Sequence, residues 1–191
     1  MKMKDFVLLA LLTALYIIVY FVSMMLISLM GPFGHAISPG VCGLLSGAIL
    51  IFISRKIGKM WQFTLMELII MGVFALMGAG YLPWFITSMI GAVLADVIAS
   101  TSSKPSVLKV AIASGLIHVG NALGGIIPAC FFAEQYMNEW IARGQKPDQM
   151  LEMVKATQGV MGLLGTVITF ILSVIGVYIG YSILKGHLKE N

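Results

Sequence analysis

The feature that most constrains this chain is the length of its uncharged apolar runs. Residues 6–30 contain no Asp, Glu, Lys or Arg, and neither do residues 158–184. A helix of about 20 apolar residues crosses the roughly 30 Å hydrocarbon core of a bilayer. In lipid such a run must be helical, because a lone strand would leave its backbone polar groups without partners. The runs therefore predict membrane-spanning helices.

Composition supports an all-α integral membrane protein. Of the 191 residues, 59% are hydrophobic and 10% are charged, whereas soluble domains are about a quarter charged. We predict one transmembrane domain over residues 1–191 with six spans, near 6–30, 36–54, 61–79, 82–100, 107–133 and 158–184. The first run begins like a signal peptide, but it is too long and lacks a small-residue cleavage site, so we expect an uncleaved span. Little chain remains for a soluble domain, so any ATP hydrolysis must come from partner proteins.

The distribution of basic residues predicts the orientation. Nine of the twelve basic residues fall on one side of the six predicted spans: Lys2, Lys4, Arg55, Lys56, Lys59, Lys104, Lys109, Lys185 and Lys189. Cytoplasmic connections carry an excess of Lys and Arg, so both termini are expected to be cytoplasmic. The net charge of +4 reflects this asymmetry and does not indicate binding to nucleic acid.

The only sizeable polar segment is residues 134–157, which we predict to be an extracellular amphipathic loop. Tyr136 and Trp140 belong to an apolar set at helical spacing, and Gly144 and Pro147 interrupt it. This pattern is typical of two short amphipathic helices lying on the outer face of the bundle. The loop is either a surface connection with interfacial anchors or a lid over a pocket.

Residues that could carry chemistry are few. The sequence has no phosphate-binding P-loop, zinc-protease motif or nucleophile elbow, so we do not expect an enzyme. Glu67 and Asp96 are the acids within predicted spans. Each is either functional, or it reaches the cytoplasmic interface or caps a neighbouring helix. Cys42 and Cys130 lie in apolar stretches. Their spacing matches no metal or redox motif, and whether they form a disulfide is left open.

A candidate ligand site lies at the outer ends of the spans, where aromatic and polar residues gather. Its predicted members are His35, Tyr81, Trp84, Phe85, His118, Asn121 and Trp140. Apolar walls with a few polar groups are typical of a small-molecule site, although an interfacial aromatic belt gives a similar pattern. His118 and Asn121 share a helix face, so they either hydrogen-bond to another helix or contact a ligand.

Small residues recur at four-residue spacing, which allows helices to approach closely. The pairs are Ala10 and Ala14, Gly91 and Ala95, Gly120 and Gly124, and Gly176 and Gly180. We expect most of these pairs to pack inside the bundle.

The layout of six spans, with Ala10-Leu11-Leu12-Thr13-Ala14 in the first, resembles the substrate-binding S components of energy-coupling factor (ECF) transporters. More narrowly, three segments are similar to the Trep_Strep group of S-component-like membrane proteins. These segments are the opening Met3-Lys4-Asp5-Phe6, the stretch 91–96 and the closing Ile183-Leu184-Lys185.

The resemblance implies a location in a bacterial cell membrane and a function there. The chain would capture a small micronutrient from outside and dock on a transmembrane T component through Ala10 and Ala14. Two cytoplasmic ATPases would use ATP to drive release inward, and the chain itself would need no cofactor or resident metal. The pocket would lie between the outer halves of spans four to six, roofed by the one–two and five–six connections. The alternative is a stand-alone transporter or channel, although no inverted repeat is visible and no ionisable pair lies deep enough to couple ions.

The substrate stays open. The sequence does not match the substrate signatures of thiamine, riboflavin, biotin or folate relatives. His35, His118 and the 14 methionines would suit a metal-bearing or tetrapyrrole ligand.

Overall fold

A computed structural model describes residues 1–102 and 104–186 of the chain. All regular secondary structure in this part is α-helical, which confirms the predicted class. The helices are α1 (Met3–Ser28), α2 (Gly34–Lys56), α3 (Gln62–Leu76), α4 (Leu82–Ala99), α5 (Val107–Phe131), α6 (Ala133–Ala142), α7 (Pro147–Thr157) and α8 (Gly159–Leu184). The helices α6 and α7 are the two short amphipathic pieces expected within residues 134–157.

Five of these helices, α1, α2, α4, α5 and α8, are long and apolar enough to cross a membrane. The predicted third span, 61–79, is shorter than expected, because α3 has 15 residues, or about 22 Å of helix. Residues in the left-handed conformation flank it: Trp61 with φ 72° before its start and Gly78 with φ 79° after its end. That conformation does not continue a helix. Six spans are therefore not established by helix length.

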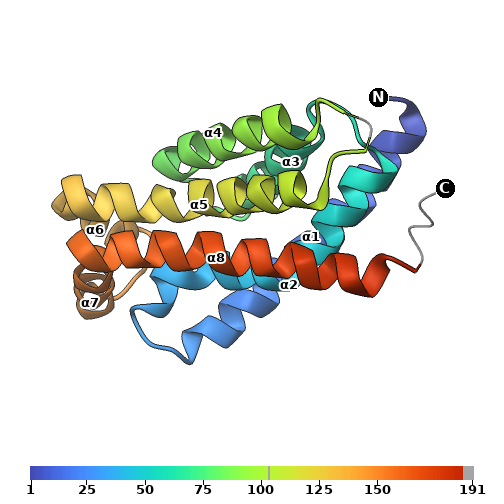
Figure 1. Ribbon diagram of the computed structural model, residues 1–191. Coiled ribbons are helices and arrows are strands. Elements are labelled where there is room, and N and C mark those ends of the chain that lie inside the picture. Colours follow the sequence, from blue (N-terminus) through green and yellow to red (C-terminus); the bar gives the residue numbers. More distant parts are fainter. Residues whose placement is uncertain (103, 187–191) are drawn as a thin grey trace.

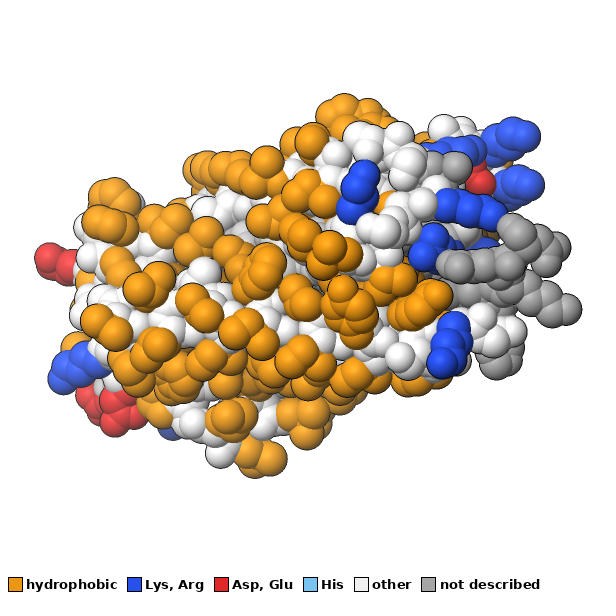
Figure 2. All heavy atoms as spheres, viewed as in Figure 1, with side chains coloured by type: hydrophobic (Ala, Val, Ile, Leu, Met, Phe, Trp, Pro, Cys, Tyr) orange, Lys and Arg blue, Asp and Glu red, His pale blue; other side chains and the backbone are white. Residues whose placement is uncertain are grey.

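The two ends of the bundle differ in charge. Figure 1 shows that α1 begins and α8 ends at the same end, and that α6 and α7 lie at the opposite end. Lys and Arg side chains gather at the first end, and Asp and Glu side chains gather at the second (Figure 2). We call these the basic end and the loop end. Lys189 lies outside the described residues; the other basic residues of the predicted cytoplasmic set belong to connections or helix ends at the basic end.

Glycines bring two pairs of helices into close contact. A Cβ atom built on Gly47 of α2 would lie 2.1 Å from the backbone of Gly176 on α8. Cβ atoms on Gly91 of α4 and Gly120 of α5 would each lie 2.6 Å from a carbonyl oxygen of the facing helix. These distances leave no room for a side chain, so the glycines are needed for packing. The expected packing inside the bundle is therefore confirmed for Gly91, Gly120 and Gly176, which belong to three of the predicted pairs.

The pair Ala10 and Ala14 is different. Both alanines are exposed on the outer face of α1, beside Val7, Leu11 and Ile18, which are 55%, 65% and 60% exposed. The opposite face of the helix is buried, with Leu9 and Tyr16 in the main core. One face of α1 thus packs against the bundle, and its other face is apolar and open.

Candidate ligand-binding site

A cavity of about 630 Å³ lies at the loop end of the bundle. Its lining comes from the second halves of α1 and α5, the start of α2, the end of α3, the start of α4, and α6 with α7. The one–two connection contributes Gly31 and Pro32. The volume is within the range of small-molecule sites. The predicted roof of two connections is present, whereas α1 and α2 line the cavity and α8, the predicted sixth span, contributes no residue to the described lining.

Aromatic rings form much of the cavity wall, and they belong to two contacting groups. Near α6, the ring centroid of Tyr81 lies 5.5 Å from Tyr136 and 5.7 Å from Trp140. Deeper in the bundle, Phe74 lies 5.1 Å from Tyr20 and 5.4 Å from Trp84. Such edge-to-face and tilted pairs stabilise one another beyond the area they bury. The walls are therefore held in place before any ligand enters.

A hydrogen-bonded chain of three side chains fixes the amide of Asn121, which lies in the cavity floor. The indole N–H of Trp84 donates to Oδ1 of Asn121 at 2.9 Å. Nδ2 of Asn121 donates to Oε1 of Glu67 at 3.2 Å and to the Ile117 carbonyl at 3.0 Å. Both N–H bonds of the amide are used, so this network sets its orientation. Asn121 can offer a ligand only the remaining lone pair of Oδ1.

Glu67 is 1% exposed and lies behind Asn121 rather than in the wall. Its Oε2 atom is buried and has no hydrogen-bond partner within the described part of the chain. A buried carboxylate oxygen without a partner is costly. Glu67 is therefore the least satisfied acid of the bundle interior and lies directly behind the cavity floor.

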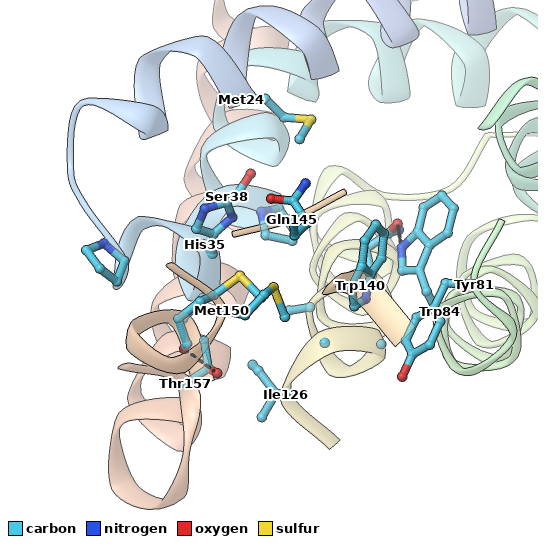
Figure 3. Close-up of a pocket in the computed structure, with 18 of the residues that line it drawn as sticks. Met24, His35, Ser38, Tyr81, Trp84, Ile126, Trp140, Gln145, Met150 and Thr157 are labelled. Carbon is cyan, nitrogen blue, oxygen red and sulfur yellow. Dashed lines mark hydrogen bonds between the residues drawn. The ribbon is translucent and has the colours of Figure 1, made fainter. Parts of the chain in front are cut away.

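The short helices α6 and α7 cover the cavity. Figure 3 shows Trp140 of α6 on one side of the cavity, and His35, Ser38 and Met150 of α7 on the other. Nη1 of Arg143 donates to the Gly80 carbonyl at 2.7 Å, which ties the end of α6 to the connection before α4. The guanidinium also pairs with Glu139. The cover is thus anchored by polar contacts at its edge.

Tyr81, which precedes α4, and Tyr136 of α6 remain neutral. Burial raises the pKa of Tyr81 to about 12, and Glu139 nearby adds to the effect. Burial also raises the pKa of Tyr136 well above its usual value. At neutral pH both phenols therefore keep their proton and present O–H groups rather than phenolates.

The structure brings together five of the seven predicted site residues: His35, Tyr81, Trp84, Asn121 and Trp140 line the cavity. Phe85 and His118 are not among its lining residues. Phe85 packs beside the Trp84 ring at 5.4 Å.

His118 takes part in a separate contact that joins α5 to α1. Its Nδ1 lies 2.7 Å from the Ser114 carbonyl, which can only accept, so Nδ1 carries a proton. Its Nε2 lies 2.9 Å from the hydroxyl of Tyr16, and in a neutral ring it accepts from that hydroxyl. One of the two interpretations of His118, a hydrogen bond between helices, is therefore observed.

Sequence reasoning missed other lining residues. Tyr20, Phe74, Tyr136 and Glu152 line the cavity but were not predicted as site residues. Tyr20 and Phe74 lie in continuous apolar runs, where an aromatic residue gives no sign that it faces a cavity. Tyr136 and Glu152 lie in the segment 134–157, whose amphipathic pattern was the available signal.

Asp96, the other intramembrane acid, caps a neighbouring helix. It accepts hydrogen bonds from the backbone N–H groups of Phe63 and Thr64 at 3.2 and 2.8 Å. It also accepts from the hydroxyls of Thr64 and Ser100 at 2.7 and 2.6 Å. The Asp96 carboxylate thus supplies acceptors for backbone N–H groups at the start of α3, which have no partner within that helix. The capping interpretation of Asp96 is therefore confirmed.

The described residues contain no group of three or more His, Cys, Asp or Glu that could hold a metal ion. Cys42 is buried and Cys130 is half-buried, and both are free thiols. The open question about a disulfide is thus answered for this structure: the two cysteines are not paired.

Comparison with known proteins places the chain in a family. No curated protein and no solved structure matches it. A family model described as hypothetical bacterial integral membrane protein (Trep_Strep) matches residues 3–190. This match covers nearly the whole chain and agrees with the five helices of spanning length. The chain therefore belongs to the Trep_Strep family of bacterial integral membrane proteins.

Proposed function

We propose that the chain is the substrate-binding subunit of an ECF-type importer, which captures a small micronutrient from outside the cell. The observation that carries the proposal is a cavity confined to one half of the bundle. Its lining belongs to the loop end, whereas the half near the basic end is filled by fully buried side chains such as Leu50, Ile53 and Phe63. A cavity of this kind suits a binding subunit better than a pore.

The positive-inside rule supports the direction of capture. Most Lys and Arg side chains gather at the end opposite the cavity (Figure 2), and cytoplasmic connections are the ones rich in Lys and Arg. With the basic end in the cytoplasm, the cavity opens toward the outside. A ligand captured there still has to cross the packed half, so transport needs a partner that moves or opens the chain.

The exposed face of α1 supports docking on a T component. Of the four small-residue pairs, three are buried between helices, and Ala10 with Ala14 faces outward. Small residues one turn apart form a shallow notch that lets another membrane helix approach closely. The partners in this proposal are one T component and two cytoplasmic ATPases, which supply the ATP hydrolysis. The chain itself has a binding role and no enzymatic one.

The test is copurification. We expect the tagged chain, extracted from its native membrane in mild detergent, to copurify with a T component and two ATPases identified by mass spectrometry. Ala14→Trp should remove these partners, because an indole would fill the notch, and Ala10→Trp should do the same. Val97→Trp is the matched control, since Val97 is 52% exposed on α4 and lies outside the notch.

Two results would contradict the proposal. The wild-type chain could purify without ATPases, which would favour a stand-alone transporter or channel. Alternatively, Ala14→Trp could retain the partners as well as Val97→Trp does, and then the docking surface is not on this face of α1.

A further inference from the structure

The cavity lining has an acidic residue but no strongly basic one. Within the described residues, the lining includes the carboxylate of Glu152 and no Lys or Arg. A second acid, Glu67, lies behind the floor and contacts it through Asn121. Apart from the tyrosines, His35 is the one other ionisable group of the described lining. An anionic ligand would find no Lys or Arg to pair with in this lining, whereas a cationic ligand would find the carboxylate of Glu152.

Six aromatic side chains surround the same space: Tyr20, Phe74, Tyr81, Trp84, Tyr136 and Trp140. The faces of Trp and Tyr rings attract cations within about 6 Å of the ring centroid. Trp140 already takes part in such a contact, because the guanidinium carbon of Arg143 lies 5.1 Å from its ring centroid. The charge of Arg143 is itself matched by Glu139, so it does not make the cavity basic.

The amide of Asn121 presents an acceptor to the cavity. It uses both of its N–H bonds within the protein, so a ligand meets its oxygen. In the cover, the indole N–H of Trp140 is a donor that is buried and has no hydrogen-bond partner in the described part of the chain. That donor would suit a neutral acceptor on the ligand, such as a hydroxyl or carbonyl oxygen.

We propose that this cavity binds an organic cation, a small molecule whose positive charge is carried on nitrogen and which bears at least one neutral oxygen acceptor. The aromatic walls would hold the charged nitrogen, the exposed carboxylate of Glu152 on α7 would balance its charge, and the Trp140 indole would donate to its oxygen. The inference rests on the proposed function in that it takes the cavity to be the ligand site.

The probes are three water-soluble molecules of nearly the same shape. Choline carries a quaternary ammonium group and a hydroxyl, 3,3-dimethylbutan-1-ol replaces the nitrogen with carbon, and 3,3-dimethylbutanoate is an anion. Each is titrated into the purified full-length chain by isothermal calorimetry. We expect choline to bind about tenfold or more tightly than the alcohol, from the attraction between a cation and several ring faces, and the anion to bind least.

Two variants test whether a preference for choline arises in the cavity. Trp140→Leu keeps apolar bulk but removes the ring face and the indole donor. Loss of the donor should weaken choline and the alcohol alike, and loss of the ring face should weaken choline by about a further tenfold. Phe85→Leu is the matched control, because Phe85 contacts Trp84 without lining the cavity, and it should leave both affinities unchanged. Size-exclusion profiles of both variants establish that they are folded.

The inference is overturned if the alcohol or the anion binds as tightly as choline, if choline shows no saturable binding, or if Trp140→Leu weakens choline and the alcohol equally. A neutral or anionic molecule that binds in a Trp140-dependent way would overturn the cation and leave the binding-subunit proposal standing. Failure of that proposal shows separately, in the copurification experiment with Ala14→Trp.

Discussion

Two deeply buried acids, Asp96 toward the basic end of the bundle and Glu67 behind the cavity floor, have different surroundings. Asp96 is 0% exposed and accepts from four donors on α3 and α4. Glu67 is 1% exposed and, in the described part of the chain, accepts from Asn121 alone and leaves Oε2 without a partner. A fully hydrogen-bonded carboxylate stabilises a fold, whereas a buried acid with a partner missing is more typical of a functional position.

The same contrast extends to the packing around each acid. Toward the basic end, side chains such as Phe63, Ile53 and Val110 are completely buried. Toward the loop end, aromatic rings surround an open volume of about 630 Å³. The molecule thus combines a tightly packed half that carries the fold with an open half that carries the site.

The largest expected effect concerns the packed half. Asp96→Ala removes the acceptor for two backbone N–H groups and two hydroxyls, and each buried donor left unpaired costs about 1–3 kcal/mol. We expect a loss of at least about 3 kcal/mol in unfolding free energy, measured by detergent-induced unfolding followed by intrinsic fluorescence. Glu67→Gln is the comparison, because its Oε1 can still accept from Asn121, and it should cost less than about 1 kcal/mol. Equal losses for the two variants would break the contrast between the acids.

A smaller effect, on binding rather than stability, is expected in the open half. Trp84→Ala removes a ring from the cavity wall and the indole donor that holds Asn121. Burying an aromatic contact is worth roughly 1–3 kcal/mol, so the affinity for a ligand found by screening should fall at least about tenfold, while the protein stays folded. Asn121→Ala should also weaken binding. Unchanged dissociation constants for both variants, as expected for the control Phe85→Ala, would mean that the ligand site lies elsewhere.

Much of this arrangement follows from local sequence. Hydropathy placed the long helices, and the pattern of residues 134–157 indicated the two helices of the cover. Aromatic residues at helix ends, such as Tyr81 and Trp84, correctly predicted that the site lies at the loop end of the bundle, because chain order fixes which helix ends meet. These features depend on neighbours in the sequence.

Contacts between distant helices could not be read in this way. The periodicity of α5 places His118 and Asn121 on one face, yet one side chain bonds to Tyr16 on α1 and the other to Trp84 and Glu67. Which helices lie opposite that face depends on how the whole bundle packs. The short α3 was missed for a related reason, since Trp61 and Gly78 adopt positive φ values that the apolar run around them does not reveal.

The central claim of this account is that the open half faces the outside of the cell, where it meets its ligand. Single cysteines at Gln145, in the cavity lining, and at Lys56, at the basic end, test it directly in a background where Cys42 and Cys130 are replaced by Ala. In intact cells treated with a membrane-impermeant maleimide, we predict ready labelling of Gln145→Cys, and labelling of Lys56→Cys only after the membrane is permeabilised. Labelling of Lys56→Cys from outside, with protection of Gln145→Cys, would contradict the account.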